Sequence, residues 1–212
     1  MNFNLDSFSI VILAQAHNPS ILNPDFLKNQ GIISNLLTPD KIICTPPVAQ
    51  VSYVEGISIT AEFDKLQFTD VSPKRIPLES PVPEISEKYI KTLPHVKYTA
   101  IGLNFIGHYT KKDNKLISSF LYNKFLKKDS WSSYGDSLPY VGLKFTYTLK
   151  NIKCTINMDT ILTNEQSQPI IAITANYHLD STTIEEITSF IMDWKTQYNH
   201  FLKIILDNFS EE

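Results

Sequence analysis

The chain has 212 residues, of which 42% are hydrophobic and 11% aromatic, so it can bury a sizeable core as one large or two small domains. Its formal net charge of −3 provides little attraction to phosphate backbones, which disfavours a nucleic-acid partner. The chain has only two cysteines, which argues against a disulfide framework. It has no apolar run of the roughly 18 to 20 residues that span a bilayer, which argues against a membrane protein. We therefore expect a cytoplasmic protein.

The first half of the chain reads as a strand, short helices, a three-strand meander and a helix. A strand is predicted over residues 8–14, and Asn18-Pro19 and Asn23-Pro24 can each start a short helix, because asparagine caps a helix and proline fits its first position. Alternating apolar and polar residues predict the meander over residues 48–70. A helix follows at residues 84–93, bounded by prolines.

The second half opens in the same way, with a strand predicted over residues 96–109 and a helix over 114–128. Three strands follow at residues 141–149, 152–159 and 171–179, since apolar and polar side chains alternate in each. Every one of these strands therefore has one apolar face that needs a cover.

The last segment, residues 182–209, predicts one long helix that supplies this cover. Thr182 and Glu185 fit a capping box, and the helix would be about 42 Å long, enough to cross a sheet. The spacing also fits a coiled-coil seam, but we favour a helix packed on its own sheet. The apolar residues recur at alternating steps of three and four, at Ile184, Ile187, Ile191, Trp194, Tyr198, Phe201 and Ile205.

These elements predict an α+β fold in which antiparallel sheets are packed by helices. Their order suggests a pseudo-duplication of a β-α-β-β-β-α unit, with residues 1–94 as the first half and residues 95–212, including the long C-terminal helix, as the second. Neither half has enough residues for a generous core of its own, so we expect the two to pack as one compact unit.

Motifs for catalysis and for cofactor binding are missing from the sequence. It contains no phosphate-binding loop, no glycine-rich dinucleotide fingerprint, no G-x-S-x-G elbow and no H-E-x-x-H. None of the five histidines forms a familiar metal-ligand spacing, and Cys44 and Cys154 have no near partner. We therefore predict no catalytic residue, no cofactor and no metal.

Two groups of residues are candidates for binding. His178 and Asp180 share one face of a predicted strand, where His178 could act as a base oriented by Asp180, although an exposed histidine and a helix-capping aspartate explain them as well. Trp131 and Tyr134 belong to a polar, aromatic loop of the kind that often binds partners. The polar face of the second meander adds Thr146, Thr174 and Asn176 to the candidates.

Three functions remain open. The first is a non-catalytic interaction or assembly module that binds another protein or a second copy of itself. The second is a binder of a small apolar ligand, or an acyl-type enzyme, with a pocket beneath Trp194 and Tyr198 and with His178 or Asp180 at its mouth. The third is a clamp-like nucleic-acid accessory protein, which the acidic balance disfavours.

Overall fold

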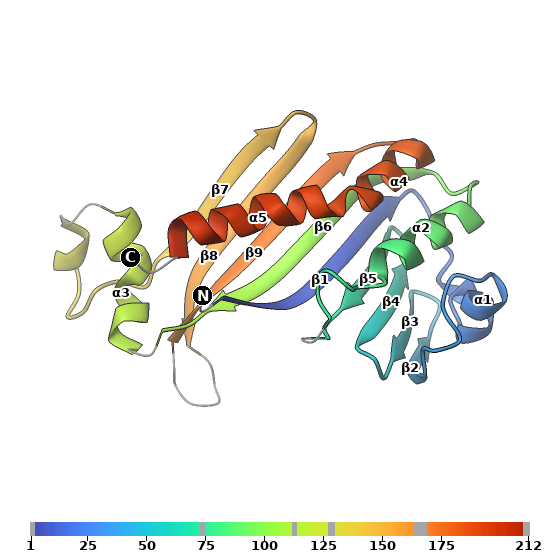
Figure 1. Cartoon of the computed structure of the whole chain (residues 1–212), viewed down its shortest axis with the longest axis horizontal. Coiled ribbons are helices and arrows are strands. Elements are labelled where there is room, and N and C mark those ends of the chain that lie inside the picture. Colours follow the sequence, from blue (N-terminus) through green and yellow to red (C-terminus); the bar gives the residue numbers. More distant parts are fainter. Residues whose placement is uncertain (1–2, 73–74, 112–113, 127–129, 163–168, 210–212) are drawn as a thin grey trace.

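The computed structural model describes residues 3–72, 75–111, 114–126, 130–162 and 169–209. It shows an α+β fold with one nine-stranded antiparallel sheet, which confirms the predicted fold class. The strands lie in the order β2-β3-β4-β5-β1-β6-β9-β8-β7 (Figure 1). The strands are β1 (Phe3–Ala14), β2 (Pro39–Cys44), β3 (Val48–Tyr53), β4 (Ile57–Glu62), β5 (Lys65–Asp70), β6 (Tyr98–Tyr109), β7 (Gly142–Leu149), β8 (Ile152–Leu162) and β9 (Pro169–Asp180).

Helices cover one face of this sheet: α2, α4 and α5 lie over it, with α5 across its middle and α4 at the end toward which β9 runs (Figure 1). The helices are α1 (Pro24–Asn29), α2 (Val82–Thr92), α3 (Asn114–Phe125), α4 (Ile184–Met192) and α5 (Trp194–Phe209), with short 3-10 helices η1 (Pro19–Ile21) and η2 (Ser130–Ser133). No helix in the described part of the chain is long and apolar enough to cross a membrane.

The core lies between the sheet and the helices because the strands alternate. In β9, for example, Ile173, Ala175 and Tyr177 are buried while the residues between them are half-buried on the opposite face. On the helix side, Trp194 and Phe201 belong to the buried stripe that the sequence predicted. Burial of such side chains supplies roughly 1.5 to 3 kcal/mol each before entropy is subtracted.

Strands β1 and β6 form the antiparallel pair at which the two halves of the chain meet. Their pairing runs from Phe3 with Tyr109 to Ala14 with Tyr98, so strands from both halves belong to one sheet. Across this pair, the rings of Phe8 and Phe105 stack with centroids 5.0 Å apart. An internal duplication stays a prediction, although each half does contribute a contiguous block of strands.

The predicted cap residues are correct for two helices and wrong for α4. The side chains of Asn18 and Asn23 cap η1 and α1 as predicted. The cap of α4 is Thr183 rather than Thr182, and it accepts a hydrogen bond from the N–H of Glu186 at 3.3 Å. Strand β2 was not predicted, and the predicted end of α3 at residue 128 lies outside the described residues.

The predicted C-terminal helix is present, but it is not continuous over residues 182–209: it is interrupted at Asp193 and forms α4 and α5. The carboxylate of Asp193 accepts a hydrogen bond from the hydroxyl of Thr196 at 2.6 Å, and its carbonyl accepts one from the N–H of Thr196 at 2.9 Å. These short-range bonds replace the regular helical ones, so the chain changes direction there while the apolar stripe continues to face the core.

Candidate functional site

On the sheet face opposite the helices, polar side chains line up across the strands. Directly paired residues lie side by side on the same face, and one such series crosses eight strands from β3 to β7. Seven strand intervals of about 4.8 Å make this series roughly 34 Å long. We call it the polar row: Ser52, Ser58, Thr69, Ser9, Asn104, Asn176, Thr155 and Thr146.

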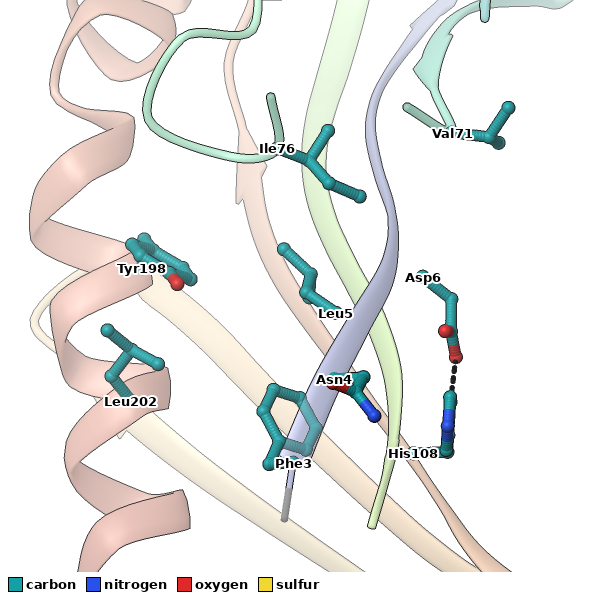
Figure 2. Close-up of a pocket in the computed structure, with 9 residues that line it drawn as sticks. All are labelled: Phe3, Asn4, Leu5, Asp6, Val71, Ile76, His108, Tyr198 and Leu202. Carbon is teal, nitrogen blue, oxygen red and sulfur yellow. Dashed lines mark hydrogen bonds and ion pairs between the residues drawn. The ribbon is translucent and has the colours of Figure 1, made fainter. Parts of the chain in front are cut away.

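Every member of the polar row is uncharged and can both donate and accept hydrogen bonds. The amide of Asn176 donates to the side-chain oxygen of Asn104 at 2.7 Å, which fixes the centre of the row. Charged residues on this face lie in other rows or on β2 at the end of the polar row. Among the described strand residues that cross-strand pairing places on this face, with Asp6 placed by Figure 2, four are lysines and four are carboxylates, so their charges balance: Lys41, Lys65, Lys144, Lys153, Asp6, Glu62, Asp159 and Asp180.

Five of the residues predicted from the sequence lie on this open face. Thr146 and Asn176 are members of the polar row itself. Thr174 lies two residues before Asn176 and accepts a hydrogen bond from the amide of Asn157 at 3.2 Å. His178 and Asp180 continue the same face toward the end of β9.

The His178 imidazole is hydrogen-bonded to Asp180, with 3.0 Å between Nε2 and Oδ1. Its cross-strand neighbours are Gly102 and Lys153, and neither has a hydroxyl or thiol that the imidazole could activate. The Asp180 side chain is 89% exposed, so water competes for it. The pair is therefore a surface contact and lacks the surroundings of a general base.

The expected pocket with His178 or Asp180 at its mouth and Trp194 and Tyr198 above it does not form. Tyr177 and Leu179 face the helices, and His178 between them must face the other way because side chains alternate along a strand. The sheet itself thus separates His178 and Asp180 from Trp194 and Tyr198.

Trp131 and Tyr134 lie apart from these residues, in the connection between α3 and β7. This connection is at the end of the sheet where β9 begins, whereas His178 and Asp180 are near the end of β9 (Figure 1). Their rings are 6.3 Å apart and largely exposed, at 62% and 79%. The structure therefore does not bring the aromatic loop to the His178 end of the open face.

A cavity that the sequence did not reveal lies beside the first residues of β1 (Figure 2). Its volume is about 620 Å³, within the range of ligand pockets. The His108 imidazole and the Asp6 carboxylate meet there at 2.7 Å, between strands β6 and β1. The cavity is lined by Phe3, Asn4, Leu5, Asp6, Val71, Ile76, His108, Tyr198 and Leu202.

A β-bulge at Asp6 gives the cavity its two kinds of lining. Leu5 pairs with Gly107 and Ser7 with Ile106, so Asp6 is the extra residue on β1. Figure 2 shows Leu5 on the side of α5 and Asp6 on the other side of the strand. Pairing of this kind depends on tertiary contacts, and the alternation of β1 alone did not indicate it.

Gly107 allows the Phe3 ring to form one wall of the cavity. A Cβ atom at Gly107 would lie only 2.5 Å from Cζ of Phe3, closer than real Cβ atoms approach. The Phe3 ring in turn meets Phe201 of α5 edge to face, with centroids 5.7 Å apart. The wall is thereby attached to the core.

A buried ion pair holds the opposite wall, where Val71 and Ile76 lie. Asp70 is fully buried at the end of β5, and its carboxylate accepts hydrogen bonds from the guanidinium of Arg75 at 3.1 and 3.2 Å and from the N–H of Ser72 at 2.9 Å. Arg75 also donates to the carbonyl of Glu55 at 2.6 Å. Charge-assisted bonds in this number hold Ser72 and Arg75 against the end of β5.

Polar side chains of β8 and β9 also lie beneath α5, at Cys154 and Tyr177. The hydroxyl of Tyr177 is 2.8 Å from Nδ1 of His200, and Cys154 is the direct cross-strand neighbour of Tyr177 on β8. Burial raises the pKa of both the Cys154 thiol and the Tyr177 hydroxyl. Both groups stay neutral near pH 7, so neither is an activated nucleophile.

No protein-family model and no curated protein matches this chain. Within the described residues, no three His, Cys, Asp or Glu side chains are grouped so that they could hold a metal ion. Two surfaces are therefore the candidates for a functional site: the open face with its polar row, and the cavity beside β1.

Proposed function

We propose that the chain is a non-catalytic interaction or assembly module that binds a protein partner, or a second copy of itself, through the open face of its sheet. The polar row is the observation that carries this proposal. It is an uncharged band on an otherwise charge-balanced face, and the centres of protein interfaces are depleted of charge in the same way.

The dimensions of the open face support a protein partner. The row spans roughly 34 Å, and the strand pairs that it crosses match about eight residues on average, which at 3.3 Å each extend roughly 26 Å in the other direction. A surface of that size is comparable to the roughly 800 Å² that each partner contributes to a standard interface. The hydroxyl and amide groups of the row can form hydrogen bonds with both donors and acceptors on a partner.

The balanced charges on the open face favour a protein over a nucleic acid. Lys65, for instance, is already paired with Glu62 at 2.8 Å on the same face. Phosphate binding requires an excess of lysine and arginine, because its affinity comes from the release of counterions. Four lysines opposed by four carboxylates provide no such excess.

Native mass spectrometry tests the proposal on protein purified gently from its own host. We expect a homo-oligomer or a stable complex with another protein for the natural chain. Thr155→Arg, in the polar row on β8 and directly beside Asn176, should abolish that complex, since it places an unpaired charge in the interface. Asn199→Arg is the matched control, because Asn199 is exposed on α5, on the helix side of the sheet.

The complex should survive Asn199→Arg, and both variants should keep the circular dichroism of the parent. A complex that persists unchanged in Thr155→Arg would contradict the proposal, because its interface would lie elsewhere. A complex lost equally in both variants would also contradict it.

A further inference from the structure

We propose that the cavity beside β1 binds an extended peptide segment of a partner protein, which pairs as an additional strand with the free edge of β1 at residues 3–7. The segment carries apolar side chains toward α5 and a basic side chain toward Asp6. This surface is separate from the open-face interface proposed above, and it can function whether or not that interface exists.

The free edge follows from unequal strand lengths. β1 has 12 residues and pairs with β6 along its whole length, but β5 has only 6 and reaches β1 from Phe8 to Leu13. Among the described residues, none pairs with β1 before Phe8 on the β5 side. Backbone N–H and C=O groups of alternate residues therefore face the cavity without a strand partner, which is the arrangement that peptides use for strand addition.

The lining shows that the cavity surrounds this edge. Phe3 and Leu5 point to the helix side of β1, whereas Asn4 and Asp6 point to the open side, and all four line the same cavity (Figure 2). A single cavity can touch both faces of one strand only by passing around its edge. A pocket for a compact ligand would instead lie on one face.

The two faces select different side chains of the bound strand. On the helix side, Leu5, Ile76 and Leu202 are apolar and half-buried, so they can receive an apolar side chain. On the open side, Asp6 is the only carboxylate among the described residues of the lining; its side chain is 47% exposed, and one of its oxygens is 2.7 Å from the His108 imidazole. A lysine or arginine on the incoming strand can pair with it, and an acidic strand would be repelled.

Fluorescence anisotropy with short labelled peptides tests this site. The probes alternate lysine with valine, leucine or phenylalanine, so that one face is basic and the other apolar. We expect saturable binding by at least one of them. Leu202→Trp, which fills the cavity, and Asp6→Lys, which reverses its charge, should each weaken binding roughly tenfold or more.

Leu206→Trp is the matched control, because Leu206 lies one turn later on α5 and does not line the cavity. It should bind the peptides as the parent does, and so should Thr155→Arg, which tests the open face independently. Retained affinity in Leu202→Trp, or no saturable binding of any probe, would overturn the proposal.

N-methylated peptides separate strand pairing from simple apolar binding. Only alternate N–H groups of the peptide face β1, so methylation of one alternate set should abolish binding and methylation of the other should not. Equal affinity of both methylated forms and the parent would show that backbone pairing is not used, and the proposal would fail.

Discussion

At the scale of single residues, Trp194 is a central contact between the helices and the sheet. It is 5% exposed, and the centroid of its ring lies 5.3 Å from that of Phe8 and 6.2 Å from that of Tyr198. We expect Trp194→Ala to lower the free energy of unfolding by about 3 to 5 kcal/mol, because it removes a large buried ring and leaves a cavity.

Urea unfolding followed by circular dichroism measures this loss. His178→Ala is the contrasting variant, since it removes only a half-buried imidazole bound to an exposed carboxylate, and its transition should stay almost unchanged. A Trp194→Ala midpoint equal to that of the natural chain would show that the helix stripe is not the main cover of the core.

His17 makes stability depend on pH. It is buried, and burial lowers its pKa, although a hydrogen bond to the Ile12 backbone and the charge of Asp64 act in the opposite direction. Because the folded pKa lies below the unfolded value of about 6.5, the unfolded chain binds the proton more readily. The free energy of unfolding should therefore fall as the pH drops below about 6.5.

The contribution of His17 is isolated by comparing the natural chain with His17→Gln at about pH 7.5 and about pH 5. The variant should lose less stability between the two pH values, since all other titrating groups are common to both proteins. Equal losses would contradict a neutral, buried His17.

At the scale of elements, the short helix α1 depends on its cap. The side chain of Asn23 accepts a hydrogen bond from the N–H of Phe26 at 2.8 Å, and the helix buries Leu27. We expect Asn23→Ala to cost about 1 kcal/mol, as the loss of a cap usually does. Asn29→Ala, at the exposed last residue of the same helix, should cost less. Equal shifts in melting temperature for the two variants would contradict the role of the cap.

At the scale of the whole molecule, both halves share one sheet and one hydrophobic core. We therefore expect a single cooperative unfolding transition. Both tryptophans lie in the second half, so tryptophan fluorescence follows that half, whereas circular dichroism follows the whole chain. Phe68→Ala in the first half and Ile173→Ala in the second should each shift the two transitions by the same amount. Two separate transitions would show that residues 1–94 and 95–212 unfold independently.

The strands other than β2, the apolar faces and the class of fold could be predicted from the sequence alone, because these depend on the spacing of neighbouring residues. The alternation in residues 171–179 and the stripe that contains Trp194 and Phe201 are local patterns, and both were confirmed. The same alternation placed Thr146, Thr174, Asn176, His178 and Asp180 together on the open face. It could not show that the sheet would separate His178 from Tyr198.

Which strands are neighbours depends on the tertiary structure, and so do the two candidate surfaces. The polar row exists because Ser9 and Asn104, 95 positions apart in the chain (104 − 9), pair across β1 and β6. The cavity exists because β5 is shorter than β1 and because Gly107 leaves room for Phe3. Strand order, register and the position of a bulge are set by contacts between distant residues, and no local spacing encodes them.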